Sequence, residues 1–501
     1  MIHSTDPAWV HRTDHVLRPD PARVVNRIFL PGQEASQPGD SRSVVIFERV
    51  LELTDAEVDE ELAAVRTAYA HRHRALEDAW ERHFALMEHR LKGAALLHEN
   101  RRRLVGAYFT QEFAIEGAAL FNPSIVPHPD QTGLPDHTTR FVMTVRAVGE
   151  GHISSVELRT GTIGSTGVLD LDSPAQVAVL PTIVPAVYSR ESFRQQLADL
   201  GGSGANSGFV LDALPDTFSE ADLDVALDQL RGQALTRGAA LRTIDRFEWI
   251  AACNYRAEFP QDSRIQERVL MPTAPSESHG IEDVRMLRFT EDDGTTRYLG
   301  TYTAYDGRSI ASQLIATDDF RTFDIAQLSG PGSKNKGMAL FPRRIDGRYV
   351  ALSRADRESN GVTTSSDLRH WDQPVLIQTP DRPWEIVQLG NCGPPVETDA
   401  GWLVLTHGVG PMRQYAIGAL LLDLDDPTIV LGRLAKPLLT PAADERDGYV
   451  PNVVYSCGAM LHDRTLVLPY GCSDSTTRIA LVDLDPLLDA LTSNPAIKET
   501  P

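Results

Sequence analysis

The clearest pattern along the chain is a pair of short strand-like runs, rich in β-branched and aromatic residues, that recurs after residue 139. The pairs occupy residues 140–146 and 152–158, 298–302 and 309–316, 348–354 and 361–365, 401–407 and 416–422, and 464–470 and 478–482. The last four copies are spaced roughly 50–60 residues apart, which is typical of a β-propeller. Turn-like segments at residues 317–323 and 365–371 occupy the same place after the second strand of their pairs. The pattern therefore predicts an all-β five-bladed β-propeller, in which ring closure removes open sheet edges.

Helical patterns occur on either side of the first pair. Thr54 and Glu57 have the spacing of a capping box, and apolar residues follow at helical spacing as far as Met87. One or two long helices are expected between about residues 54 and 105, whereas residues 1–50 are proline-rich and irregular and end in an extended piece at 42–47.

A second helical run begins at Ser219, where Asp222 stands three residues on and apolar residues follow. These patterns predict an N-terminal extended arm and helices over residues 1–110 and a propeller domain over residues 111–490. They also predict a helical insertion at about residues 200–265, between blades one and two, and a C-terminal tail over residues 491–501.

The net charge of the chain argues against some kinds of binding partner. A net charge of −21 over 501 residues argues against a nucleic-acid or anionic-membrane partner, because both require a basic face. No apolar run approaches the roughly 18 residues of a membrane span. The first residues lack the basic and apolar regions of a secretory signal, so a cytoplasmic location is expected.

The four cysteines have neither disulfide nor metal-ligand spacing, and buried free thiols are their expected state. The histidines between residues 71 and 98 are dispersed along the helical segment, which favours solvated side chains over a metal site. No metal and no cofactor are predicted.

Candidate chemistry centres on residues 282–285, where two adjacent carboxylates and an arginine open a strand-like run. Neighbouring side chains of a strand point to opposite faces. Only one of Glu282 and Asp283 is then expected to enter a shared cavity, with Arg285 on the side of Asp283. A carboxylate beside a fixed guanidinium suits a proton donor or a sugar ligand, and the alternative is an ordinary surface ion pair.

Polar side chains that recur at one place in each blade of a propeller converge on its central funnel. The candidates for substrate contacts, in chain order, are Asn122, Arg146, Glu150, Asp283, Arg285, Tyr305, Asp306, Lys336, Arg354, Gln388, Asn391, His407, Asp447, Tyr449 and Asp474.

An ordered set of short motifs, taken together, resembles glycoside hydrolase family 130 over about residues 115–490. The motifs lie at residues 121–123, 282–285, 335–336 with 339–342, 393–395, 406–408 and 470–474. The family consists of five-bladed propellers that act on β-mannosides, mostly as inverting phosphorylases and in some cases as hydrolases. The N-terminal helical arm resembles that of its larger members.

The resemblance implies a role for several positions. Asp283 matches the family's general acid, with Val284 in place of the family's proline. Asn122, Arg146 and Asp474 match residues that hold the mannosyl unit.

Phosphate ligands are implied in the same way. Lys336, Arg354 and His407 fall where phosphorylases keep cationic ligands of phosphate. Gln388 stands where a lysine is expected, which removes one cation from the phosphate site.

The implied reaction is inverting phosphorolysis of β-1,2- or β-1,4-linked manno-oligosaccharides, with inorganic phosphate as co-substrate and α-D-mannose 1-phosphate as product. Such an enzyme requires one carboxylic acid, whose proton passes through the mannose 3-hydroxyl in this family, because phosphate supplies the nucleophile. An inverting β-mannosidase requires a second carboxylate as base, for which Glu150, Glu385 and Asp447 are the candidates. A third hypothesis is a non-catalytic propeller that binds carbohydrate. The presence of Asp283 in its motif argues against this hypothesis. A homo-oligomer in which the arm contacts a neighbouring subunit is left open.

Overall fold

The computed structural model describes residues 6–31, 42–89, 91, 93–165, 167–233 and 237–493. The chain divides into two compact units. One lies within the bounds Met1–Pro19, Ala118–Pro174 and Pro181–Pro501, and the other within Asp20–Gly117 and Ala175–Leu180. Two expectations lie partly outside the described residues. The expected absence of a signal segment concerns residues 1–5, and the expected tail includes residues 494–501.

In its described residues, the smaller unit contains four α-helices and a two-stranded antiparallel sheet. Its elements are α1 (Arg42–Glu52), α2 (Asp55–Tyr69), α3 (Leu76–Glu88), α4 (Glu99–Tyr108), β2 (Val24–Ile28) and β3 (Thr110–Ala114). Thr54 and Glu57 form the expected capping box at the start of α2. The interval expected to hold one or two long helices holds three, because the chain turns after Tyr69 and again after Glu88, and α3 then packs against α4.

The expectation of an irregular segment that ends in an extended piece at 42–47 was wrong, because α1 begins at Arg42. Its run of β-branched residues favours a strand, but Phe47 and Val50 are buried in one core with Trp80, Phe84 and Leu104. Burial of an apolar helix face outweighs the local propensity.

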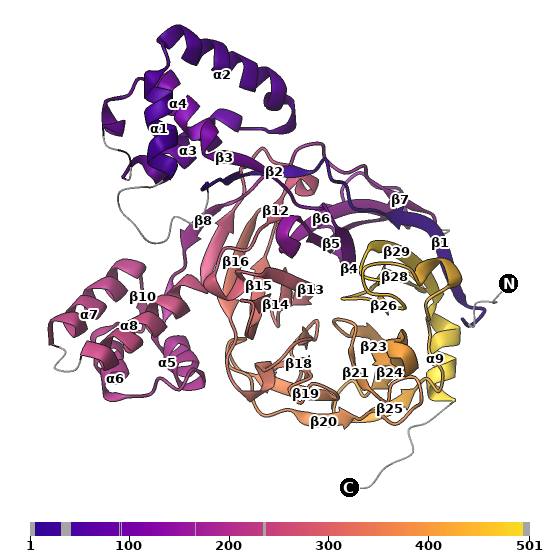
Figure 1. The fold of residues 1–501 in the computed structure, drawn as a ribbon. Helices are drawn as coiled ribbons and strands as arrows, with labels where there is room; N and C mark the ends of the chain where they lie inside the picture. Colours follow the sequence, from indigo (N-terminus) through magenta and orange to yellow (C-terminus); the bar gives the residue numbers. More distant parts are fainter. Residues whose placement is uncertain are drawn as a thin grey trace. The chain divides into compact units, whose positions relative to one another are not determined.

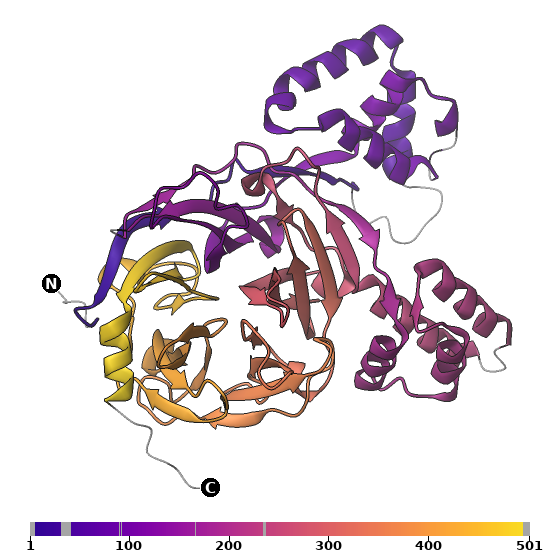
Figure 2. The same cartoon turned by 180° about the vertical axis from the view of Figure 1, so that it is seen from behind.

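The larger unit is predominantly β, as expected, and its sheets are open. One sheet runs in the order β4 (Ala119–Pro127), β5 (Thr139–Val148), β6 (Ser154–Ile163), β13 (Gly280–Thr290), β14 (Thr296–Tyr305), β15 (Ile310–Thr317), β16 (Thr322–Gln327), β11 (Tyr255–Glu258) and β8 (Thr182–Pro185), with β7 (Leu169–Leu171) and β12 (Val269–Leu270) paired to β6. A second sheet contains β17 (Ala339–Leu340), β18 (Tyr349–Ser353), β19 (Asn360–Ser365) and β20 (Val375–Gln378). A third contains β21 (Gln388–Asn391), β23 (Gly401–Val409), β24 (Tyr415–Leu422) and β25 (Val430–Arg433), with β22 (Val396–Thr398) paired to β23. In Figure 1 these sheets follow one another around a common centre, and Figure 2 shows the same arrangement from behind.

Each of the five predicted strand pairs is confirmed as an antiparallel hairpin: β5–β6, β14–β15, β18–β19, β23–β24 and β28–β29. The two matching turns each place one residue in the left-handed region, Phe320 at φ 54° and Leu368 at φ 63°. Both side chains are buried, so the turn directs an apolar anchor back into its own sheet.

The last sheet joins the two ends of the described chain. It contains β1 (Val10–Leu17), β29 (Thr476–Asp483), β28 (Thr465–Cys472), β26 (Val454–Tyr455) and β27 (Met460–His462). Strand β1 is antiparallel to β29, with Val10 opposite Val482. The guanidinium of Arg12 donates hydrogen bonds to the carboxylates of Asp6 and Glu445. A strand at residues 10–17 was not expected from the irregular sequence there, and helix α9 (Leu484–Thr492) follows β29.

A cluster of four helices interrupts the larger unit between β8 and β11. They are α5 (Arg190–Asp199), α6 (Ala205–Ala213), α7 (Glu220–Gln233) and α8 (Arg237–Ala252), with the short strands β9 (Tyr188–Ser189) and β10 (Thr217–Phe218). Ser219 and Asp222 exchange hydrogen bonds at the start of α7, as the sequence predicts. Phe193, Phe218 and Phe247 form the centre of a separate apolar core in this cluster.

The four cysteines are free and buried, which confirms that expectation. Within the described ranges, no helix combines the length and the apolar character needed to cross a membrane.

The contact between α3 and α4 gives a testable prediction for the smaller unit. A Cβ atom added at Gly106 would lie 2.0 Å from the carbonyl oxygen of Trp80, so Gly106→Ala must force the two helices apart. We expect a loss of about 1–3 kcal/mol in the stability of this unit, visible as faster hydrogen exchange in α3 and α4. Gly117→Ala is the control, because its Cβ would make only an ordinary 3.4 Å contact with the Cβ of Ala114. Equal exchange in the two variants would contradict the tight helix contact.

Candidate active site

A cavity of about 210 Å³ in the larger unit collects most of the polar residues predicted from the sequence. Nine of the fifteen candidates line it: Asn122, Arg146, Asp283, Arg285, Lys336, Arg354, Gln388, His407 and Asp474. They come from β4, β5, β13, β21, β23, the loop that precedes β17 and the loops that follow β18 and β28. The topology therefore brings together groups that are up to several hundred residues apart.

The local backbone of β13 differs from the expected regular strand. Asp283 has φ 57°, and the pairing of β13 with β14 shifts between Glu282 and Arg285. A bulge of this kind breaks the alternation of faces. Both Glu282 and Asp283 consequently line the cavity, and the expectation that only one of them would do so was wrong.

A positive φ angle also occurs at two other cavity residues. Asn122 has φ 50° in β4, where the register shifts between Phe121 and Ser124, and Asp474 has φ 50° just after β28. The left-handed region costs free energy for most residues but is reached more readily by Asn and Asp. Such strained positions concentrate at functional sites, which supports a role for these three residues.

Arg146 binds both carboxylates of β13. Its Nη2 lies 3.0 Å from Oε1 of Glu282, and its Nη1 lies 3.3 Å from Oδ1 of Asp283. Asn122 donates from Nδ2 to the same Oδ1 of Asp283 at 2.8 Å. Glu282 also accepts a 2.5 Å hydrogen bond from Nζ of Lys336. Glu282 thus links Arg146 to Lys336.

The charges around Asp283 set its protonation. Burial acts to raise the pKa of Asp283, but the positive charges of Arg146 and Arg285 and the hydrogen bond from Asn122 outweigh it and hold the pKa below its ordinary value. The pKa of Asp474 is shifted in the opposite direction. Burial, with the negative charge of Asp283 added to it, raises the pKa of Asp474 to about 6.

Arg354 and His407 form a second group in the cavity. Nη1 of Arg354 lies 3.1 Å from Nε2 of His407, and Nδ1 of His407 lies 3.2 Å from the carbonyl oxygen of Asn391. The carbonyl can only accept, so Nδ1 carries the proton and Nε2 accepts from Arg354. Burial, followed by the charges of Arg354 and Arg285, lowers the pKa of His407 well below its ordinary value. His407 is therefore neutral and holds Arg354 in place, although the resemblance implied a cationic ligand.

Positive charge exceeds negative charge in this cavity. Five cationic side chains and three carboxylates line it: Arg146, Arg285, Lys336, Arg354 and Arg413, and Glu282, Asp283 and Asp474. Among the described residues, no carboxylate pairs with Arg354 within 4.0 Å, and Arg285 donates to the carbonyl oxygen of Asp283 and the hydroxyl of Tyr455. In a protein of net charge −21, this cavity has the surplus of cations that an anionic substrate requires.

Apart from Val450 and Val453, three residues that line the cavity were not named in the sequence analysis: Arg413, Tyr415 and Tyr455. Tyr415 stacks on His407 with ring centroids 6.0 Å apart, and Tyr455 meets the same ring edge-on at 4.9 Å. Arg413 has φ 55° and lies in the loop between β23 and β24. Arg413 and Tyr415 lie between and at the start of the strands of the fourth pair, whereas Tyr455 lies in β26, before the fifth pair.

Six predicted residues do not line the cavity: Glu150, Tyr305, Asp306, Asn391, Asp447 and Tyr449. Asn391 lies behind the cavity, where Nδ2 donates to the carbonyl oxygen of Gly337. Tyr305 lies under Lys336, with Nζ 6.0 Å from the ring centroid. Asp306 accepts hydrogen bonds from backbone N–H groups of its own turn.

The remaining three are on the surface of the unit. Glu150 and Asp447 are exposed, and Tyr449 is 68% exposed and stacks on His152. Glu385, the third candidate for a hydrolytic base, is buried outside the cavity beside Arg433. Burial raises the pKa of Glu385 to about 7.

No cluster of three or more metal-ligating His, Cys, Asp or Glu side chains occurs in the part of the chain that the structure describes.

Comparison with known proteins identifies relatives for the C-terminal half of the chain. Residues 261–493 match a family model described as β-1,4-mannooligosaccharide phosphorylase. A 1,2-β-oligomannan phosphorylase of Thermoanaerobacter sp. is 32% identical over 44% of this chain and 74% of its own length. A β-1,2-mannobiose phosphorylase of Listeria innocua is 34% identical over 41% of this chain and 59% of its own length.

A solved structure of the Listeria innocua β-1,2-mannobiose phosphorylase with β-1,2-mannobiose gives a TM-score of 0.44 at 22% identity, covering 76% of this chain and 94% of that one. The sequence relatives establish the relationship. The chain belongs to glycoside hydrolase family 130.

The raised pKa of Asp474 predicts a stability cost at neutral pH. The folded state favours the protonated carboxyl, so the cost is fully present above about pH 6 and disappears as the pH falls below the ordinary value of 3.8. We expect Asp474→Asn to stabilise the protein by up to about 3 kcal/mol at pH 7.5 and by roughly half as much at pH 5.

The measurement is thermal or urea unfolding of the variant and its parent at both pH values. Asp136→Asn, at an exposed turn, is the control and is expected to change stability at neither pH. A gain that is the same at both values would show that the charge of Asp474 is not its cause.

Proposed function

We propose that this protein is an inverting β-mannoside phosphorylase that cleaves β-1,2- or β-1,4-linked manno-oligosaccharides with inorganic phosphate and releases α-D-mannose 1-phosphate. The observation that carries the proposal is the surplus of cations in the cavity, with Arg354 free of any carboxylate partner among the described residues. Phosphate is a dianion near neutral pH, and a bidentate guanidinium matches its geometry. The named activities of the family relatives are consistent with this chemistry.

The proposed reaction divides the cavity into two sides. Phosphate, held by Lys336 and Arg354, attacks the anomeric carbon as the glycosidic bond breaks, which converts a β-mannoside into an α-phosphate. The leaving oxygen takes a proton that originates on Asp283 and passes through the mannose 3-hydroxyl, as the family resemblance implies. The other product is the mannoside shortened by one unit.

Asp283 must be protonated to act as the acid, yet its surroundings lower its pKa in the empty site. A bound phosphate adds negative charge beside Lys336 and Arg354 and offsets the field of the arginines. The pKa of Asp283 then rises, because a nearby like charge disfavours the ionised form. In this mechanism the acid forms when phosphate is bound, so the protonation of Asp283 is coupled to the presence of the nucleophile.

Asn122, Arg146 and Asp474 are proposed to hold the mannosyl unit. All three contact or electrically influence Asp283, so a sugar bound by them lies against the acid. Gln388, which donates to the hydroxyl of Tyr415 at 3.3 Å, lies where the family resemblance expects a lysine. Arg413 is a further proposed contact and supplies a cation to the same cavity.

We also propose that the sheets of the larger unit form five blades, each built on one of the five confirmed hairpins. The sheet that runs from β4 to β8 would then contain the first two blades, joined where Gly280 of β13 pairs with Ser154 of β6. On this reading, β1 completes the fifth blade beside β29.

An inverting β-mannosidase is the second candidate, and the pKa of Asp474 favours it. A carboxylate with a pKa of about 6 can take a proton from water near neutral pH. The three bases expected from the sequence do not line the cavity, so Asp474 replaces Glu150, Glu385 and Asp447 in this role.

The deciding experiment is incubation with β-1,2- and β-1,4-mannobiose, with and without inorganic phosphate, followed by identification of the products. We expect phosphate-dependent α-mannose 1-phosphate from the parent and a loss of at least about 100-fold in turnover for Asp283→Asn, which keeps the side-chain shape but cannot donate the acidic proton. Binding of mannobiose should persist in the variant. Free mannose without phosphate would identify a hydrolase, and turnover that is unchanged in the variant would refute the acid.

Arg354 provides a separate test of the phosphate side. Arg354→Ala removes a guanidinium that no carboxylate neutralises, so we expect the phosphate concentration for half-maximal rate to rise about 10- to 100-fold, with little change for mannobiose. Steady-state kinetics with each substrate varied in turn give both values. Arg343→Ala is the matched control, because Arg343 is on the surface and pairs with Glu397. An unaltered phosphate dependence would count against the proposed phosphate site.

A further inference from the structure

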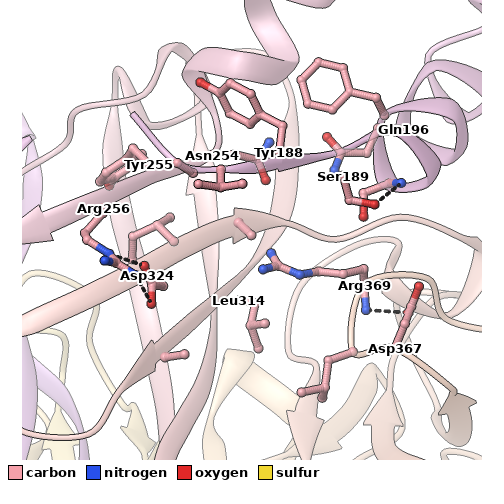
Figure 3. A pocket seen from close by; sticks show the side chains of 18 of the residues that line it. Tyr188, Ser189, Gln196, Asn254, Tyr255, Arg256, Leu314, Asp324, Asp367 and Arg369 are labelled. Carbon is pink, nitrogen blue, oxygen red and sulfur yellow. Dashed lines mark hydrogen bonds and ion pairs between the residues drawn. The ribbon is translucent and has the colours of Figure 1, made fainter. Parts of the chain in front are cut away.

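A second and larger cavity, of about 520 Å³, lies where β9 and α5 meet the sheet strands β14 to β16 (Figure 3). Its volume is within the range of small-molecule sites. It shares no lining residue with the candidate active site in the part of the chain that the structure describes. It is therefore a distinct compartment of the same unit.

The side chain of Arg369 extends into this cavity without a partner for its charge. Figure 3 shows the guanidinium reaching across the space, and the only drawn bond of the residue is from its backbone to Asp367. No described residue forms an ion pair or hydrogen bond with the guanidinium. Burial lowers the pKa of Arg369, which shows that its charge is partly desolvated. An arginine stays charged in a protein, so this arrangement costs free energy unless an anion is present.

Three carboxylates line the cavity, of which Glu258 is exposed and Asp324 and Asp367 bond to other groups. Asp324 forms a two-pronged pair with Arg256, at 2.7 and 3.1 Å. Oδ1 of Asp367 accepts the backbone N–H groups of Arg369 and His370 and so holds the turn in place. Arg297, a third cation of the wall, pairs with Glu291 at 3.0 Å. Of the three arginines that line the cavity, Arg369 is the one whose guanidinium has no ion pair with a described residue.

Neutral polar side chains line the wall opposite Arg369: Ser189, Ser192, Gln196 and Asn254. Gln196 is 2% exposed, and its Nε2 donates to the carbonyl oxygen of Gln327 at 3.2 Å, while its Oε1 has no hydrogen-bond partner. Ser189 accepts a bond from the N–H of Ser192, which leaves its own O–H free to donate. These amides and hydroxyls suit the hydroxyl groups of a polyol, which both donate and accept.

Apolar side chains complete the enclosure. Tyr188, Leu314 and Leu368 line the cavity and are each about 5% exposed or less. Their surfaces suit the C–H face of a sugar ring. A ligand that matches all three walls has one anionic group, several hydroxyls and a compact ring.

We propose that this cavity is a binding site for a hexose phosphate, with the phosphate on Arg369 and the sugar hydroxyls on the wall formed by Ser189, Ser192, Gln196 and Asn254. The bound molecule joins α5 of the helical cluster to the sheet that also contains β13 and Asp283. This inference goes beyond the proposed function and does not depend on it, because no residue of the candidate active site takes part.

The test measures binding by calorimetry in the Arg354→Ala background, in which phosphate binding at the candidate active site is expected to be weakened. The probes are glucose 1-phosphate, glucose 6-phosphate, mannose 1-phosphate and mannose 6-phosphate, with inorganic phosphate and mannose as controls. We expect at least one hexose phosphate to bind with 1:1 stoichiometry and more tightly than either control. Adding Arg369→Gln should weaken that binding by about tenfold or more, and Arg369→Lys should weaken it less.

Arg348→Gln is the matched control, because Arg348 pairs with Asp372 on the surface and lines neither cavity. Hydrogen exchange of the parent protein supplies a readout that needs no variant. The binding probe should protect residues 188–196 and 366–369. Absence of hexose-phosphate binding, equal binding of inorganic phosphate or mannose, indifference to Arg369→Gln, or protection confined to residues 282–285 would each overturn the proposal. None of these outcomes bears on mannobiose phosphorolysis, which is measured separately.

Discussion

The candidate active site depends on the ion pairs that Arg146 forms with two neighbouring carboxylates. Glu282 and Asp283 are consecutive carboxylates in one cavity, and their mutual repulsion is tolerable because one guanidinium lies within 3.3 Å of both. Arg146 is a cavity residue of β5, and the hairpin of β5 and β6 fixes its position beside β13. The remaining charges are arranged around this triplet, with Lys336 on Glu282 and Asn122 on Asp283. Without Arg146, one of the two carboxylates would have to bind a proton or leave the cavity.

Much of the candidate site could be predicted from the sequence, because the repeated strand pairs place matching positions at one centre. Asn122, Asp283 and Asp474 were found in this way. The direction of individual side chains could not be predicted. The bulge in β13 shifts the alternation of side-chain faces by one residue, and nothing in the sequence around Glu282 indicates a bulge. The neutral state of His407 also escaped prediction, because it follows from burial and from the neighbouring guanidiniums.

Some elements of the fold are specified by the local sequence, and others depend on long-range packing. Hairpins such as β14–β15 and β23–β24 have alternating or β-branched strands and turn residues that specify them locally. Helix α1 was mistaken for an extended piece, because its β-branched run is helical only through the burial of Phe47 and Val50. Strand β1 has no clear alternation and was missed, because its partner is at the other end of the chain.

The pairing of β1 with β29 has a consequence for synthesis. The ribosome makes β1 long before β29, because Val10 of β1 lies opposite Val482 of β29. Asp20–Gly117, the main part of the smaller unit, falls between β1 and β4 in the sequence, so its helices can fold while β1 still has no partner. Until β29 emerges, β1 and β28 both present unpaired strand edges that other nascent chains can join. Emergence of β29 is therefore the step that removes this aggregation hazard, and a chaperone that shields β1 would be most useful before it.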